Sequence, residues 1–240
     1  MIDFQKLVYD TIEAQSERHS HTEIDVNTFH PSQMAMCKRQ MLLSKLGVVD
    51  HNPETKGIFL MGTLMHKHLE EYVEEVADFE VEVEKEVSHT FKTKTSLPDI
   101  RIVGHCDLYI PFLDLVVDYK SQTGWYYFDP HSNNILDKET HLNQLNIYMD
   151  ALDANNGKLV YLDKGKFEPR QYPEEDNTYI NYEPDRVNEV VTKTEEVVEE
   201  LQENGIPQSL EEVPYGKCGC FVCNQESKNT LEFAHIAEMQ

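Results

Sequence analysis

Asp118 and Lys120 stand two residues apart at the end of an apolar run, in the stretch LVVDYKSQTG at residues 115–124. Side chains alternate between the two faces of a strand, so a strand here would direct both charges to one face. A buried charge is costly unless it is paired or bound to a metal. Asp107 lies near the start of CDLYI on the preceding predicted strand. If these strands are neighbours, the carboxylates of Asp107 and Asp118 can converge.

Converging carboxylates predict a metal site, because they repel and raise each other's pKa unless a cation lies between them. Mg²⁺ is held by oxygen ligands, often one or two carboxylates together with water and substrate phosphate. Lys120 beside such a site could stabilise charge on a phosphate or help to activate water. This is the arrangement of a metal-assisted phosphodiesterase. The alternative is a strand-end ion pair of Asp118 with Lys120, with Asp107 in solvent.

Two predicted helices could complete the site. His66 lies at the edge of the apolar stripe of GIFLMGTLMHKHLEEYVEEVAD, four residues after Gly62, and is a candidate third metal ligand. Glu70 shares its face but is given little weight. Gln144 and Tyr148 are one turn apart in HLNQLNIYMDALDANNG and could orient Lys120 or bind backbone phosphate. The alternatives are an interfacial histidine, a core tyrosine and a rim glutamine.

Four of the five cysteines form a second candidate site. Three fall within six residues, at Cys218, Cys220 and Cys223, and Cys37 lies far upstream. In a reducing compartment such clustering indicates a metal site before it indicates disulfides. Four thiolates suit a [4Fe–4S] cluster or a tetrahedral Zn²⁺. A metal here would close a loop of nearly the whole chain and attach the C-terminal segment to the rest. Cys106 is expected in the core.

The predicted elements are a helix over residues 1–20, a helix from an N-cap at Ser32 to Gly47, and the helix that carries His66. Three strands follow, in FEVEVEKEVSHTF, IRIVGHCDLYI and LDLVVDYKS, then the helix of Gln144 and a strand in KLVYLDKG. A long acidic helix ending at Gly205 precedes the cysteines. We expect a core over residues 1–183 and a C-terminal extension over residues 184–240 packed on it.

The charge balance is strongly acidic, with 44 acidic and 21 basic residues and a formal net charge of −23. Such a balance argues against a polyanionic partner unless a local basic groove exists or the protein works in high salt. Lys38, Arg39 and the aromatic run in TGWYYFDP are candidate nucleic-acid contacts, the aromatics by stacking on unpaired bases. No apolar window of about 18 residues exists, so no membrane span and a cytoplasmic location are expected.

Taken together, the motifs resemble the RecB-type nucleases of the PD-(D/E)xK superfamily, in its iron–sulfur branch. The residues that carry the resemblance are, in order, Gly62-x-x-x-His66, Gly104-x-x-Asp107, Asp118-x-Lys120 and Gln144-x-x-x-Tyr148, flanked by the cysteines. The chain is most similar to the CRISPR-associated adaptation exonucleases of antiviral defence and their viral relatives. The compressed cysteine spacing in CGCFVC departs from the pattern of that branch.

The resemblance implies an α/β, restriction-endonuclease-like core, a central mixed sheet flanked by helices, with a C-terminal helical, cysteine-containing extension. It implies that His66, Asp107, Asp118 and the backbone carbonyl of Tyr119 bind Mg²⁺ or Mn²⁺, and that Lys120 is catalytic, with Gln144 and Tyr148 completing the site. It favours a [4Fe–4S] cluster on the four cysteines, with Zn²⁺ as the alternative.

The expected activity is that of an exonuclease on single-stranded DNA. The alternative is a non-catalytic DNA-end-binding or adaptor subunit that acts with an integrase or helicase.

Overall fold

The computed structural model describes residues 25–46, 48–50, 53–93, 97–122, 138–165, 169–205, 207, 209–218, 220, 223 and 231–233. Its centre is a mixed sheet with the strand order β1-β4-β5-β6-β7, to which β3 is added beside β4 and β8 beside β6. The β1–β4 and β5–β6 pairs are parallel, and the other pairs of this sheet are antiparallel. Its strands are β1 (Thr28–Phe29), β3 (Glu82–Phe91), β4 (Ile100–Ile110), β5 (Leu115–Gln122), β6 (Asn156–Asp163), β7 (Pro169–Tyr172) and β8 (Ile180–Asn181).

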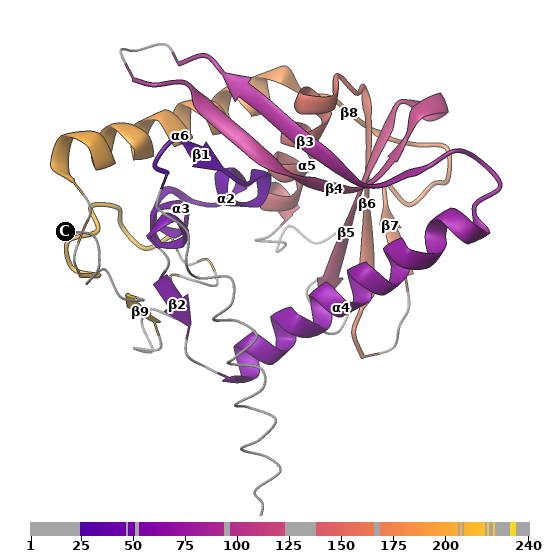
Figure 1. Cartoon of the computed structure of the whole chain (residues 1–240), viewed down its shortest axis with the longest axis horizontal. Helices are drawn as coiled ribbons and strands as arrows, with labels where there is room; N and C mark the ends of the chain where they lie inside the picture. Colours follow the sequence, from indigo (N-terminus) through magenta and orange to yellow (C-terminus); the bar gives the residue numbers. More distant parts are fainter. Residues whose placement is uncertain are drawn as a thin grey trace, which may run out of the picture.

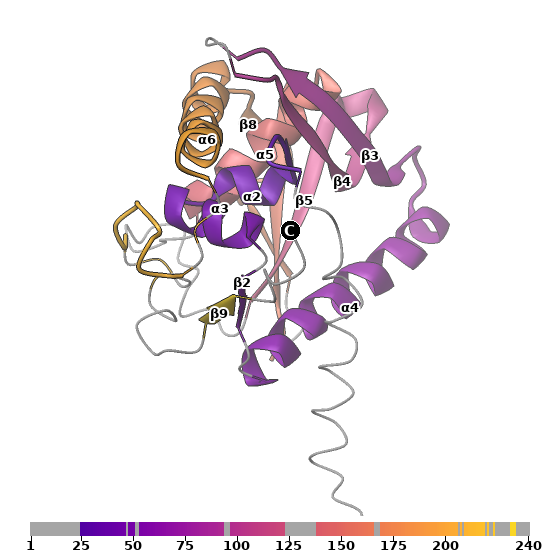
Figure 2. The ribbon, with the colours of Figure 1, turned by 60° about the vertical axis from the view of Figure 1, so that its left-hand side comes forward.

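Helices cover both faces of this sheet, as the view in Figure 2 shows. Helix α4 (Pro53–Val76) lies along one face. The other face carries α2 (Pro31–Ala35), α3 (Lys38–Lys45), α5 (Lys138–Leu152) and α6 (Pro184–Asn204). This arrangement confirms the expected α/β class with a central mixed sheet flanked by helices (Figure 1). Among the described helices, none combines the length and the apolar character that a membrane crossing requires.

The main hydrophobic core lies between the sheet and the group of helices that contains α5. Leu145 and Met149 of α5 are fully buried, and they pack so closely on β6 that a Cβ added at Gly157 would lie 2.8 Å from Leu145 Cδ2. A smaller cluster, Leu108, Ile110, Leu115 and Val117, lies on the α4 side of β4 and β5 and contacts Val73. Both carboxylate-bearing strands are thus fixed by apolar packing on their two faces.

Helix α4 is held less deeply than its apolar stripe suggests. Met65 is buried, but Met61, Tyr72 and Val76, which share the predicted stripe, are 50%, 46% and 79% exposed. The residues that reach the sheet are Gly62, Met65 and those one or two turns further on, such as Val73. The periodicity therefore located the helix correctly and overstated how much of it is core.

The helix predicted from Ser32 to Gly47 is wrong in its continuity. The chain forms α2 with His30 as its N-cap, becomes extended at Met36 (φ −71°, ψ 169°) and begins α3 after Cys37. Two contacts stabilise the break: Cys37 Sγ accepts a bond from the amide of Gln40 (3.4 Å), and Lys193 Nζ donates to the carbonyl of Met36 (2.6 Å). The break places the cysteine at a helix N-terminus, outside the helical hydrogen-bond ladder.

Most of the other predicted elements are confirmed. β3, β4, β5, β6 and α5 lie where the sequence indicated, and α6 ends at Asn204, where Gly205 has a φ of 78° that glycine adopts readily. The short strands β1, β7 and β8 were not predicted, nor was the antiparallel pairing of β2 (Val48–Asp50) with β9 (Leu231–Phe233). The predicted helix over residues 1–20 and the TGWYYFDP aromatics lie outside the described residues, and the division at residue 184 stays a prediction.

Candidate active site

Asp107 and Asp118 lie on neighbouring strands, just beyond the point where the β4–β5 ladder ends. The last paired residues before that point are Leu108 and Val117, so Asp107 and Asp118 come next on their strands. Asp107 Oδ2 accepts a hydrogen bond from the backbone amide of Tyr119. That bond joins the two strands beyond the ladder and fixes Asp107 beside β5.

Helix α4 brings a histidine to the same place. His66 Nδ1 lies 3.7 Å from Asp107 Oδ1, and the His66 ring stands edge-on to that of Tyr119 with 6.0 Å between centroids. This approach depends on Gly62, since a Cβ there would lie 2.6 Å from Ser121 Oγ. Glycine therefore lets α4 lie against the end of β5, which confirms the close approach expected from the sequence.

His66, Glu70 and Asp107 form a group that can hold a metal ion, because one ligand atom from each lies within 4.8 Å of the others. Burial, then the charges of Glu84 and Asp107, raise the pKa of Glu70 to about 7. Among the described residues, the buried atoms His66 Nε2 and Glu70 Oε1 have no hydrogen-bond partner. Unpaired buried polar atoms beside repelling carboxylates are what a cation would satisfy, so these residues fit the divalent ion that the resemblance implies.

Asp118 and Lys120 form a buried ion pair next to this group. Asp118 is 2% exposed, and its Oδ2 lies 2.6 Å from Lys120 Nζ. Burial raises the pKa of Asp118 to about 6, against the opposing effect of the Lys120 charge. Lys120 Nζ also donates to Gln144 Oε1 (2.9 Å), and Gln144 Nε2 donates to Tyr148 Oη (3.3 Å). The lysine amine is thus held between β5 and α5, with Gln144 orienting it.

The sequence interpretation missed or underweighted two residues here. Glu70 received little weight, although its place four residues after His66 on one helix face was the signal for it. His141, one turn before Gln144, was not singled out. Its Nδ1 lies 3.0 Å from Tyr161 Oη, and burial lowers the pKa of His141 to about 3, so the ring is neutral.

The predicted site residues are therefore brought together in two adjoining sets. His66 and Asp107 join Glu70 in the ligand group, while Asp118 pairs with Lys120, which Gln144 and Tyr148 support. Lys38 and Arg39, which were candidate phosphate contacts, bind other groups of the protein. Lys38 pairs with Glu196, whereas Arg39 is 6% exposed and donates hydrogen bonds to backbone carbonyls.

The four cysteines also converge, from α3 and from the C-terminal segment. Their sulfurs all lie within 4.8 Å of one another, with Cys37 Sγ 3.7 Å from Cys220 Sγ and Cys218 Sγ 3.9 Å from Cys223 Sγ. A tetrahedral ion with bonds of about 2.3 Å to sulfur separates its ligands by about 3.8 Å. These separations fit one such ion directly, and a four-iron cluster would need the sulfurs to move apart. Cys106 is fully buried, away from this group, as predicted.

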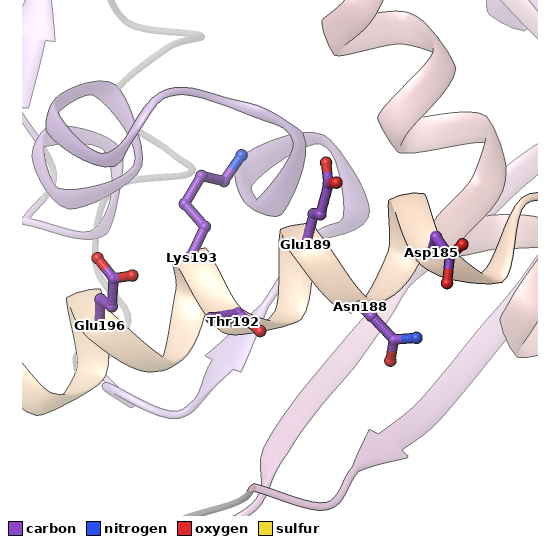
Figure 3. Close-up of a pocket in the computed structure, with 6 residues that line it drawn as sticks. All are labelled: Asp185, Asn188, Glu189, Thr192, Lys193 and Glu196. Carbon is purple, nitrogen blue, oxygen red and sulfur yellow. The ribbon is translucent and has the colours of Figure 1, made fainter.

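A surface hollow of about 500 Å³ lies elsewhere, along α6 (Figure 3). Its lining residues are Asp185, Asn188, Glu189, Thr192, Lys193 and Glu196. The amine of Lys193 is bonded to the Met36 carbonyl, and the lining carries three carboxylates. The hollow therefore lacks the free cations that a nucleic-acid phosphate would need.

The solved structures that are similar to this chain include the following three. The crystal structure of SSO0001 is 20% identical, with a TM-score of 0.56 over 82% of this chain and 88% of its own. An alkaline exonuclease from Laribacter hongkongensis is 12% identical, with a TM-score of 0.45 over 85% and 95% of the two chains. A phage-related exonuclease from Haemophilus somnus 129PT is 15% identical, with a TM-score of 0.34 over 59% and 67%. The likeness to SSO0001 supports the fold.

In sequence, no curated protein matches the chain. A family model described as the PD-(D/E)XK nuclease superfamily matches residues 75–225, which include both strand aspartates, Lys120, the Gln144–Tyr148 pair and three of the four converging cysteines. The chain belongs to the PD-(D/E)XK nuclease superfamily.

Proposed function

We propose that this protein is a divalent-metal-dependent DNA nuclease that degrades single-stranded DNA from an end. The observation that carries the proposal is the position of the His66–Glu70–Asp107 group directly beside the Asp118–Lys120 pair. Three candidate ligands, two of them with unpaired buried atoms, lie next to a fixed amine, so the site offers both a place for a cation and a positive charge for a phosphate. A structural ion pair alone would not explain the unpaired atoms of His66 and Glu70.

Each residue has a role that follows from its contacts. His66, Glu70 and Asp107 would hold Mg²⁺ or Mn²⁺, with Asp118 and the Tyr119 carbonyl as the further ligands that the resemblance implies. The ion, when bound, would polarise the scissile phosphate and lower the pKa of water. Lys120, held at 2.6 Å by Asp118 and at 2.9 Å by Gln144, places a cation where negative charge develops on the phosphate.

The four cysteines would hold a structural metal centre. The resemblance favours a [4Fe–4S] cluster, whereas the sulfur separations of 3.7 Å and 3.9 Å favour a single Zn²⁺. Iron, acid-labile sulfide and zinc analysis of anaerobically prepared protein separates the two. Absorbance near 400 nm with matching iron and sulfide would establish the cluster, and colourless protein with one zinc per chain would establish zinc.

The test of the nuclease proposal compares the parent protein with Lys120→Met on end-labelled single-stranded DNA in Mn²⁺ or Mg²⁺. We expect the parent to release short products and Lys120→Met to lose at least 100-fold in rate, because the phosphate charge loses its fixed cation. Lys85→Met is the matched control, since Lys85 pairs with Glu82 on β3, outside the site. Chelation with EDTA should abolish the parent activity.

Three results would contradict this proposal. Cleavage by Lys120→Met at the parent rate would remove the site assignment. Binding of DNA ends without any cleavage would favour the adaptor function, alongside an integrase or helicase. Equal cleavage of circular and linear single strands would replace the exonuclease with an endonuclease. A panel of RNA and duplex substrates tests the choice of single-stranded DNA.

A further inference from the structure

A buried arginine joins helix α3 to the segment that leads into the cysteines. Arg39 Nη1 donates to the carbonyls of Val213 (3.1 Å) and Tyr215 (2.6 Å), and Nη2 donates to that of Leu210 (2.9 Å). The planar guanidinium presents several N–H donors in a rigid fork, so one side chain can bind three carbonyls of an irregular segment. Arg39 is 6% exposed, which makes these bonds costly to lose.

Other contacts hold the same segment to the same helices. Val213 is buried in the main core, and Tyr215 Oη donates to the carbonyl of Glu196 in α6 (3.0 Å). Lys38 Nζ lies 5.7 Å from the centre of the Tyr215 ring. Beyond the cysteines, β9 pairs with β2, the strand that follows α3. The cysteine loop is therefore attached to the α3 region on both of its sides.

We propose that Arg39 is the positioning residue of the cysteine centre, which it builds by docking the segment 210–215 on α3 independently of any metal. Arg39 lies two residues from Cys37, and Tyr215, which it binds, lies three residues from Cys218. The guanidinium thereby sets Cys37 and the three C-terminal cysteines opposite one another. This inference rests on the proposed cysteine centre and is independent of the nuclease assignment.

Loop-closure entropy gives the size of the effect. Cys37 and Cys220 are 183 positions apart in the chain, and a metal that had to bring them together unaided would close that whole loop. With Arg39 already joined to Tyr215, the loop still to be closed is a few residues on each side. The closure cost follows the logarithm of loop length with a coefficient of 3/2, so prior docking raises metal affinity on the order of 100-fold. The metal then orders a local loop instead of stapling the C-terminal extension to the core.

The test uses full-length protein and two measurements that do not depend on nuclease activity. Zn²⁺ is the probe, because four sulfurs within 4.8 Å bind it whatever the native occupant. Its affinity is measured by competition with a chromophoric chelator. Limited proteolysis with mass spectrometry follows cleavage within residues 205–217. The variants are Arg39→Met, Arg39→Lys and Cys220→Ser, and Arg101→Met, at an exposed arginine of β4, is the control.

We expect Cys220→Ser to lose Zn²⁺ affinity while residues 205–217 stay as protected as in the parent. Arg39→Met should bind Zn²⁺ about 10- to 100-fold more weakly than the parent, a loss limited by the other contacts of segment 210–215, which persist. The same variant should expose the segment to protease. Arg39→Lys keeps the positive charge but lacks the planar guanidinium, so its Zn²⁺ affinity should lie between those of the parent and Arg39→Met. It replaces Arg39→Met in both measurements if that variant does not fold. Arg101→Met should match the parent.

Two outcomes would overturn the inference. If Cys220→Ser is cleaved as fast as Arg39→Met, the metal and not the arginine docks the segment. If both Arg39 variants bind Zn²⁺ like the parent, Arg39 has no positioning role. A parent that binds no Zn²⁺ would remove the cysteine centre itself and leave the nuclease proposal standing, because that proposal is tested on DNA.

Discussion

Glu70 shows how one carboxylate links metal binding to stability. In the metal-free protein its pKa is raised to about 7, mainly by burial and then by the charges of Glu84 and Asp107. A carboxyl group whose folded pKa exceeds its unfolded pKa stabilises the fold below the unfolded value, and that contribution is lost as pH rises through the folded value. For Glu70 the window runs from about pH 4.5 to about pH 7.

We therefore predict that Glu70→Gln stabilises the metal-free protein at pH 8 relative to the parent, and less so as pH falls below 7. The gain should be on the order of 1 kcal/mol, because the group is partly exposed and solvent screens its charge. The measurement is urea unfolding in EDTA at pH 5 and pH 8. In Mn²⁺ the order should reverse, since the variant lacks a ligand. Glu71→Gln, on the exposed neighbour, should shift neither curve.

Gln144 carries a second residue-scale prediction. It is the link between the Lys120 amine and Tyr148 Oη. Gln144→Leu removes that acceptor, so the amine loses one of the two groups that orient it, and we expect kcat to fall about 10-fold with little change in DNA affinity. Tyr148→Phe removes only the hydroxyl at the far end of this series of hydrogen bonds, so its kcat should fall less. A larger loss in Tyr148→Phe than in Gln144→Leu would show that the tyrosine acts directly on substrate.

At the scale of elements, the position of α4 decides whether the ligand group forms. Gly62→Ala places a methyl group 2.6 Å from Ser121 Oγ and 3.3 Å from Lys164 Nζ. We expect α4 to shift outward and the Mn²⁺ concentration for half-maximal cleavage to rise, because His66 moves away from Asp107. Alanine also favours the helix by up to about 1 kcal/mol, so the melting temperature should change little. Gly216→Ala, which meets nothing within 4 Å, is the control.

The sequence predicted the elements that carry strong local patterns, and it missed those that depend on contacts from afar. β3 to β6, α5 and α6 are long, periodic and bounded by turn residues. β1, β7 and β8 have two to four residues each and exist because a neighbouring strand pairs with them. The break between α2 and α3 is stabilised in part by the Lys193 bond to Met36, which no local pattern reveals.

The same distinction separates the parts of the site. Asp107, Asp118 and Lys120 were predictable because alternation along two adjacent strands fixes their direction. The part that Glu70 takes in the ligand group was not predictable, because it depends on how closely α4 approaches β4 and on the neighbouring charge of Glu84. The burial of Arg39 was missed for a similar reason: its partners are carbonyls more than 170 positions away.

At the scale of the whole molecule, the charge of −23 opposes a polyanionic substrate. Several described basic side chains are already paired with carboxylates, including Lys38, Lys85 and Arg186. We predict that the association rate constant of Lys120→Met for a labelled single strand in Mg²⁺ increases as NaCl is raised from about 20 mM to about 150 mM. Stopped-flow fluorescence measures this rate. Salt screens the repulsion at distances beyond about 10 Å. A steep decrease with salt would instead indicate a basic groove that releases counterions.

We predict that residues 75–225, which match the superfamily, do not fold on their own. Six of the fully buried side chains precede that stretch, and so do His66 and Cys37; the six are Phe29, Met34, Met41, Leu42, Leu43 and Leu46. A fragment cut to the matching stretch would expose core residues that these side chains cover in the whole chain. It would also lack Cys37, the fourth thiol of the cysteine group. Such a fragment should aggregate on expression, whereas the whole chain keeps these packing partners.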